Sequence, residues 1–100
     1  MTEEFKEVQD LNKSQYTEGP KIALLKAVSK LGEEVGELIM EINKSTGVKH
    51  SKPSIVHVKE ELADVLQNVL SIADLYTISY QELCKELKKK NKKWKSKLYS

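Results

Sequence analysis

The stretch LLKAVSKLGEEVGELIMEI, residues 24–42, decides the fold of this chain. Its apolar residues recur at steps of three, four and seven, which is the spacing of one face of an α-helix. These residues are Leu24, Leu25, Val28, Leu31, Val35, Leu38, Ile39 and Ile42. Because Pro20 suits a first helical turn, the pattern predicts a helix over about residues 20–44.

The same helical period extends over the rest of the chain. It predicts a short helix over about residues 3–13, a long one over about 54–76 with Ser54 as its N-cap, and a last helix that begins after Ser79. Ser79 and Glu82 have the spacing of a capping box. No stretch alternates like a strand, so we predict an all-α helical bundle of about four helices. At 100 residues it is a single domain spanning 1–100.

The apolar coverage of the two central helices is wide, since Val65, Leu66, Val69 and Leu70 span more than one face. Two arrangements remain open. Either a second copy completes the bundle as a homo-oligomer, or the first and last helices cover both sides of a monomer. Cys84, at helical spacing with Tyr80 and Leu87, is predicted to be a small buried hydrophobe.

The single cysteine excludes a disulfide within the chain and makes a cytoplasmic protein the default expectation. No apolar run approaches the roughly 18 residues that a membrane span needs, so we expect no membrane association.

The net charge of +2 hides a strong asymmetry. Residues 85–97 hold eight lysines and one acid, so the basic C-terminal end, residues 85–100, contrasts with an acidic body of charge −5. An acidic body suits a bound cation, and a basic end suits an anion.

The acids of the body are grouped. Glu34 and Glu37 are one helical turn apart in the first central helix, and Glu61 and Asp64 repeat that spacing in the second. Two antiparallel helices can therefore bring four carboxylates to one point, where a hard divalent ion such as Mg²⁺ offsets their repulsion. A solvated charged face is the open alternative.

The motif Glu33-Glu34-Val35-Gly36-Glu37, followed by Glu61-Leu62-Ala63-Asp64, resembles the EExxE…ExxD signature of MazG-like nucleotide pyrophosphohydrolases, which belong to the all-α NTP pyrophosphatase superfamily. The resemblance covers roughly residues 5–95. It implies hydrolysis of nucleoside triphosphates or deoxynucleoside triphosphates to the monophosphate and pyrophosphate by a metal-activated water.

The resemblance also implies a site and a cofactor. The implied metal ligands are Glu34, Glu37, Glu61 and Asp64. Glu33 matches the first motif glutamate, and would support the ligands or help to activate water. The implied cofactor is Mg²⁺, with Mn²⁺ as a possible substitute, and the implied assembly is a homodimer or homotetramer.

Four further residues are candidates for substrate binding. Lys88, Asn91 and Lys95 match, by the same resemblance, a phosphate-contacting cluster on the last helix; a solvated basic tail is the alternative. Asn68 lies four residues after Asp64, on the same helix face. We predict either that it contacts the ribose or base or that it is a buried, hydrogen-bonded amide. We expect His50 and His57 to be surface residues.

Two rival functions remain open. The lysines could bind nucleic acid, or the chain could be a non-catalytic helical interaction protein. The acidic body and the lack of a nucleic-acid-reading motif argue against nucleic acid as a partner.

Overall fold

The computed structural model describes residues 2–46 and 55–99, which form four helices. Helix α1 spans Thr2–Gln15, α2 spans Pro20–Thr46, α3 spans Ile55–Leu75 and α4 spans Tyr80–Tyr99. Within these ranges there is no strand, so the predicted all-α class is confirmed. The observed helix ends lie within a few residues of the predicted ones, and the last helix continues to the last described residue, Tyr99.

The turns between helices have clear local causes. Gly19 has a φ of 104°, a conformation that favours glycine, and it ends the segment before Pro20 starts α2. Before α4, the Glu82 backbone N–H donates to Ser79 Oγ at 3.1 Å, and the Ser79 N–H donates to the Glu82 carboxylate at 3.3 Å. The predicted capping box is therefore confirmed. Ser54, predicted as an N-cap, and His50 lie outside the described residues.

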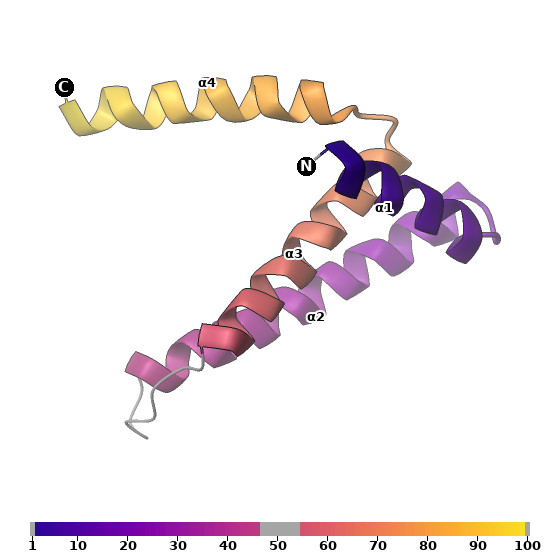
Figure 1. Cartoon of the computed structure of the whole chain (residues 1–100), viewed down its shortest axis with the longest axis horizontal. Coiled ribbons are helices and arrows are strands. Elements are labelled where there is room, and N and C mark those ends of the chain that lie inside the picture. Colours follow the sequence, from indigo (N-terminus) through magenta and orange to yellow (C-terminus); the bar gives the residue numbers. More distant parts are fainter. Residues whose placement is uncertain (1, 47–54, 100) are drawn as a thin grey trace.

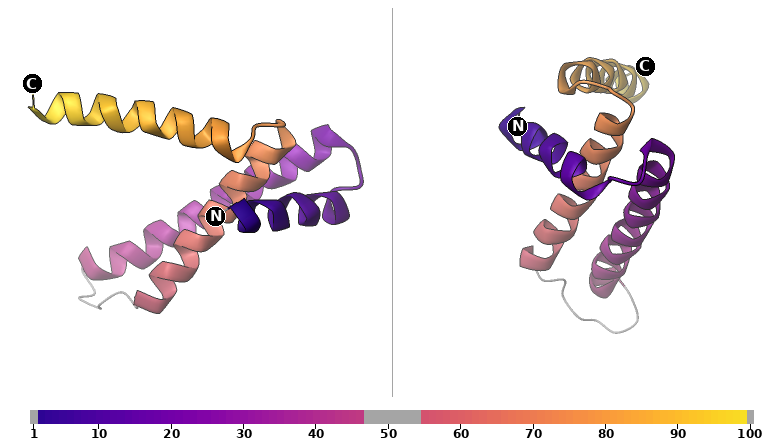
Figure 2. Two further views of the ribbon diagram at one scale, coloured as in Figure 1. Left: turned by 45° about the horizontal axis from the view of Figure 1, so that its top comes forward. Right: turned by 90° about the vertical axis from the view of Figure 1, so that its right-hand side faces the viewer.

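Helices α2 and α3 lie side by side as an antiparallel hairpin, α1 packs against α3, and α4 extends away from the other three (Figure 1). The two further views agree that most of α4 is separated from the hairpin (Figure 2). The radius of gyration is 16.3 Å, whereas a compact domain of this length has about 13 Å. The single chain is therefore an open arrangement.

The core is small and lies where α1, α3 and the start of α4 meet. Phe5 and Val8 of α1 pack with Leu70 and Ala73 of α3, and the Tyr80 ring lies 6.2 Å from that of Phe5. Only the first turn of α4 joins this core, through Tyr80 and Leu83.

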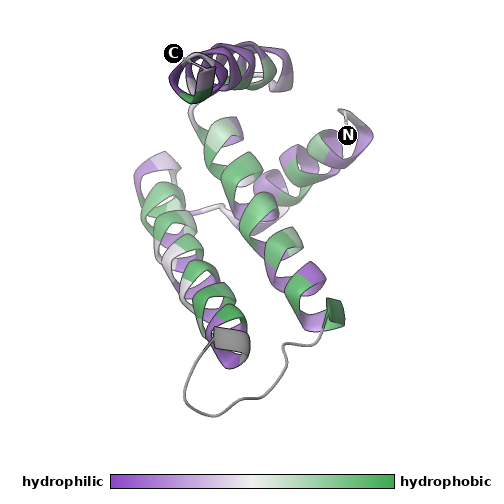
Figure 3. Ribbon diagram, turned by 90° about the vertical axis from the view of Figure 1, so that its left-hand side faces the viewer, coloured by the Kyte–Doolittle hydropathy of each residue, from purple (hydrophilic) through white to green (hydrophobic). Residues whose placement is uncertain are grey.

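A second group of large apolar side chains has no cover in the single chain, and Figure 3 shows apolar residues along both helices of the hairpin. These exposed apolar residues form a stripe along each helix. On both helices the stripe is rotated about the helix axis in the same sense, by roughly 100°, from the side that contacts the other helix. Because the helices are antiparallel, the two stripes lie on one side of the hairpin. We call this surface the apolar face; its exposed members are Leu25, Val28, Val35, Ile39 and Ile42 of α2 and Ile55, Leu62, Leu66 and Val69 of α3.

The apolar stripe predicted within residues 24–42 divides into two parts in the structure. Leu24, Leu31 and Leu38 are half-buried, whereas Leu25, Val28, Val35, Ile39 and Ile42 are exposed. The prediction for Cys84 is wrong, since its side chain is exposed. The reason is that α4 leaves the core after Leu83, so the helical period of this segment marks a face without a partner in the chain.

Candidate metal centre

Three carboxylates meet between the two helices of the hairpin. Glu34 of α2 and Glu61 and Asp64 of α3 each offer an oxygen, and these atoms all lie within 4.8 Å of one another. Glu61 and Asp64 share a side of α3 because they are three residues apart. All three side chains are half-buried. The hairpin thus brings together three of the four predicted metal ligands.

Two oxygens of this group are buried without a hydrogen-bond partner among the described residues: Glu34 Oε2 and Glu61 Oε2. A buried carboxylate oxygen without a donor is costly, and native proteins rarely leave one unsatisfied. A divalent cation with oxygen ligands satisfies both atoms at once. The arrangement therefore fits a metal ion better than it fits a solvated charged face.

The raised pKa values of Glu34 and Glu61 also favour a bound cation. Burial raises the pKa of Glu34, and the charges of Asp64, Glu37 and Glu61 raise it further. Burial likewise raises the pKa of Glu61, followed by the charge of Glu37. In both cases the carboxylate is held in surroundings that disfavour its negative charge, which a bound cation reverses.

Glu37 lies at the edge of this group. Its charge acts on both Glu34 and Glu61, so it is a near neighbour, yet its side chain is exposed and its oxygens fall outside the group of three. Glu33 is also exposed, and it lines a separate surface depression with Ile22 and Leu25. The structure therefore places Glu37 beside the candidate ligands and Glu33 on another side of α2.

A cavity of about 390 Å³ begins one turn beyond Asp64, between α1, α2 and α3. Asn68 is buried in its wall and its side-chain amide donates to the Asp64 carbonyl oxygen at 2.8 Å. Lys30, which lies four residues before Glu34 and so on the same side of α2, lines the cavity too. Our sequence reasoning missed Lys30, although this spacing was visible. Further lining residues are Gln15, Tyr16, Gln67 and Ser71.

A buried polar network closes this end of the hairpin. The Asn12 side-chain amide donates to the Ser71 carbonyl oxygen at 3.1 Å and to Asp74 Oδ2 at 2.9 Å, while Ser71 Oγ donates to Asn12 Oδ1 at 2.7 Å. Asn12 is thus bonded to two residues of α3, and α1 is fixed beside the cavity. No sequence motif indicates this network, because its members are about 60 residues apart in the chain.

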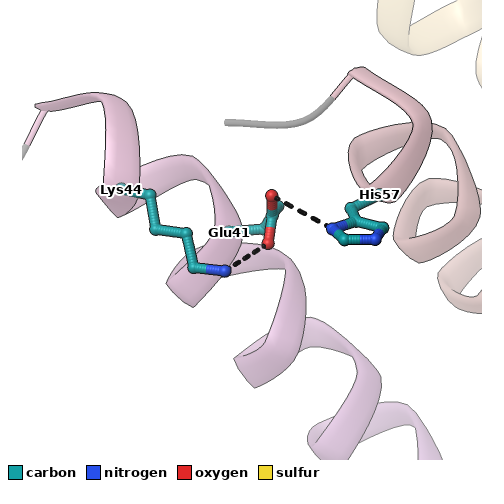
Figure 4. A network of polar contacts seen from close by, with 3 residues as sticks. All are labelled: Glu41, Lys44 and His57. Carbon is teal, nitrogen blue, oxygen red and sulfur yellow. Dashed lines mark hydrogen bonds and ion pairs between the residues drawn. The ribbon is translucent and has the colours of Figure 1, made fainter. Parts of the chain in front are cut away.

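A second polar network lies towards the other end of the hairpin (Figure 4). Glu41, buried on α2, accepts from Lys44 Nζ at 3.0 Å, and its other oxygen lies 3.8 Å from His57 Nδ1 of α3. His57 is exposed, as expected, and is outside the group of three carboxylates. It joins the two helices rather than extending the candidate metal centre.

A sequence model of the MazG nucleotide pyrophosphohydrolase domain matches residues 23–98, which is most of the chain and contains all three converged carboxylates. The chain belongs to the MazG family. No curated protein and no solved structure gives a match. None of the described helices is long and apolar enough to span a membrane.

The acids have a basic counterpart in the lysines of residues 85–97, but the single chain does not bring the two together. Lys88, Asn91 and Lys95 are exposed on α4, which diverges from the hairpin (Figures 1 and 2). Their role as phosphate contacts stays a prediction. Within one chain, Lys30 is the lysine that lines the cavity next to the carboxylates.

Proposed function

We propose that this MazG domain hydrolyses nucleoside triphosphates, including deoxynucleoside triphosphates, to the monophosphate and pyrophosphate with Mg²⁺ as cofactor. The observation that carries the proposal is the convergence of Glu34, Glu61 and Asp64, with two buried oxygens that lack a partner, in a chain of this family. Mn²⁺, which also takes oxygen ligands, is the expected substitute.

The acidic residues are assigned different roles according to their positions. Glu34, Glu61 and Asp64 hold the ion, and Glu37 is near enough to serve as a fourth ligand once its side chain turns inward. A bound Mg²⁺ offsets phosphate charge and makes a bound water more acidic. Glu33, as the first motif glutamate, is assigned to assisting the ligands or the water.

The nucleoside is proposed to occupy the cavity beside the carboxylates. Asn68 lies in its wall one turn beyond Asp64, so a triphosphate bound at the carboxylates has its sugar or base within reach of this amide. We propose that Lys30, which lines the same cavity, pairs with a phosphate oxygen. Lys88, Asn91 and Lys95 remain candidates for phosphate contacts in an assembly of several copies.

The chain is proposed to act as a homodimer or homotetramer through the apolar face. Leu25 and Ile42 mark the ends of the α2 stripe, about 26 Å apart along the helix. Monomeric proteins rarely expose so large a continuous apolar patch. The cytoplasmic location expected from the single cysteine stays a prediction.

The proposed reaction is tested by incubating the protein with a panel of NTPs and dNTPs and Mg²⁺ and separating the products. Monophosphate and pyrophosphate are expected. Diphosphate with orthophosphate, or no turnover of any nucleotide, contradicts the proposal. Asp64→Asn and Glu37→Gln should abolish turnover with helicity unchanged. Glu60→Gln is the matched control, because Glu60 is an exposed neighbour of Glu61 outside the group of carboxylates.

A further inference from the structure

One polar part of the wall of the cavity between α1, α2 and α3 is held rigidly. Asn12 of α1 and Ser71 of α3 both line the cavity, and each is only 7% exposed. They bond to each other between the two helices, with Ser71 Oγ donating to Asn12 Oδ1 at 2.7 Å. Because this pair is buried and mutually bonded, its hydrogen-bonding character is set before a ligand arrives.

The hydrogen bonds of the pair determine what it can offer to a ligand. The two N–H groups of the Asn12 amide donate to the Ser71 carbonyl oxygen at 3.1 Å and to Asp74 Oδ2 at 2.9 Å. Both partners are acceptors, which fixes the orientation of the amide. The hydroxyl proton of Ser71 is used on Asn12 Oδ1. The pair therefore has no donor left, whereas Ser71 Oγ and Asn12 Oδ1 keep lone pairs that accept.

Other residues of the wall do not impose a preference of this kind. Gln15 and Gln67 are exposed, and a free amide can present either its oxygen or its nitrogen. Val8 and Leu11 add apolar side chains, which suit the flat faces of a base. Selectivity for the polar edge of a base thus depends on the buried pair, which only accepts.

The pair also lies at a suitable distance from the candidate metal centre. Asp64, Asn68 and Ser71 follow one another at steps of four and three on α3, so they lie along one side of this helix. Seven residues of helix rise about 10 Å, which is similar to the length from the α-phosphate of a nucleotide to the far edge of its base. A nucleotide with its phosphates at the carboxylates and its sugar beside Asn68 therefore brings the edge of its base to Asn12 and Ser71.

We propose that Asn12 and Ser71 select nucleotides whose base carries an exocyclic amino group at this edge, as cytosine and adenine do. The amino group donates to Ser71 Oγ and Asn12 Oδ1. Uracil and hypoxanthine, the deaminated counterparts, carry a carbonyl oxygen in the same place, and this oxygen would face two acceptors with no proton to share. The inference rests on the proposed function and names its substrate class.

Matched pairs of substrates test the selection, because deamination replaces the amino group by a carbonyl and leaves the rest of the base nearly unchanged. The value of kcat/KM is measured with Mg²⁺ for dCTP against dUTP and for dATP against dITP. We expect the amino member of each pair to be favoured roughly ten- to a hundredfold. Equal values within each pair, or a preference for the carbonyl member, overturn the inference but leave the proposed function standing.

Ser71→Ala tests whether the pair is the cause of the preference. It removes one of the two acceptors and should lower the ratio of kcat/KM for dCTP to that for dUTP about fivefold. A loss of folded protein does not change this ratio, because both substrates are measured on the same sample. Ser14→Ala is the matched control: it removes a hydroxyl from the same cavity wall, where Ser14 Oγ donates to the Leu11 carbonyl outside the pair. An unchanged ratio in Ser71→Ala, or an equal change in Ser14→Ala, overturns the inference.

Binding of the monophosphates separates the inference from the proposed reaction. dCMP and dUMP are titrated into the protein with Mg²⁺ and followed by calorimetry. If no nucleotide is turned over, the proposed function fails and these affinities decide the inference. Tighter binding of dCMP that is reduced in Ser71→Ala then supports it, whereas equal affinities, or no binding of either monophosphate, overturn it.

Discussion

Glu34 on α2 and Asp64 on α3 lie together in the middle of the hairpin, each offering an oxygen to a group that also includes Glu61. The charge of Asp64 is one of the causes that raise the pKa of Glu34, after burial itself. Two like charges are held together by the packing of the helices, so the folded chain stores a repulsion that a cation relieves.

A divalent metal should therefore stabilise the chain. Saturating Mg²⁺ or Mn²⁺ should raise the thermal midpoint, by the equivalent of about 2.7 kcal/mol at one hundred times the dissociation constant. Glu34→Gln and Asp64→Asn should each lose most of this gain in differential scanning fluorimetry. A full metal response in either variant, or its loss in Glu60→Gln, would show that the ion binds elsewhere.

Without metal, stability should fall as the pH rises through the titration of the site. Because the folded-state pKa values of Glu34 and Glu61 are raised, the folded chain binds protons more tightly than the unfolded chain. This contribution is complete below the ordinary glutamate value of about 4.3 and is lost as the pH passes the raised values. Glu34→Gln/Glu61→Gln removes it.

The check is urea denaturation of both proteins in EDTA between about pH 4 and pH 7. The free energy of unfolding of the double variant, relative to that of the wild type, should increase steadily with pH. A difference that is constant over this range would mean that the two carboxyls titrate normally in the folded chain.

Glu37 and Glu33 should differ in their effect on metal binding. Glu37 lies near Glu61, so Glu37→Gln should weaken Mn²⁺ binding about tenfold. Glu33 lines a different part of α2, so Glu33→Gln should leave the affinity nearly unchanged and act on turnover alone. Calorimetric Mn²⁺ titration separates the two effects; equal losses of affinity would place Glu33 among the ligands.

Asn12 should stabilise the fold well beyond an average polar residue. Asn12→Ala leaves Ser71 and Asp74 without their partner in a buried setting, which costs about 1–3 kcal/mol. Ser14→Ala, which removes an exposed bond to the Leu11 carbonyl on the same helix, is the control and should cost much less. Urea denaturation that ranks the two variants equally would contradict the role of the network.

The apolar face should govern association. Ile39 and Met40 are adjacent and both exposed, but only Ile39 lies on the face. Ile39→Glu should reduce the assembly to monomers in sedimentation analysis, whereas Met40→Glu should leave it intact. If both variants stay assembled, another surface joins the copies.

Local sequence was enough to predict the helix positions, most of the acidic group and the family. Helix positions follow from apolar spacing, and the start of α4 follows from Ser79 and Glu82, because capping is a contact between residues three apart. The metal group was predicted for the same reason: Glu61 and Asp64 share a side of one helix whatever surrounds it. The family followed from the order and spacing of the two acidic motifs, and the match over residues 23–98 confirms it.

Tertiary structure decided which of these residues meet. It set Glu34 against Asp64, placed Glu33 on another side of α2, and joined Asn12 to Ser71 across most of the chain length. It also left Cys84 exposed, although helical spacing had predicted burial. Periodicity defines the faces of a helix, but burial depends on whether another helix covers a given face. That is set by the packing of distant segments, which the spacing within one helix does not encode.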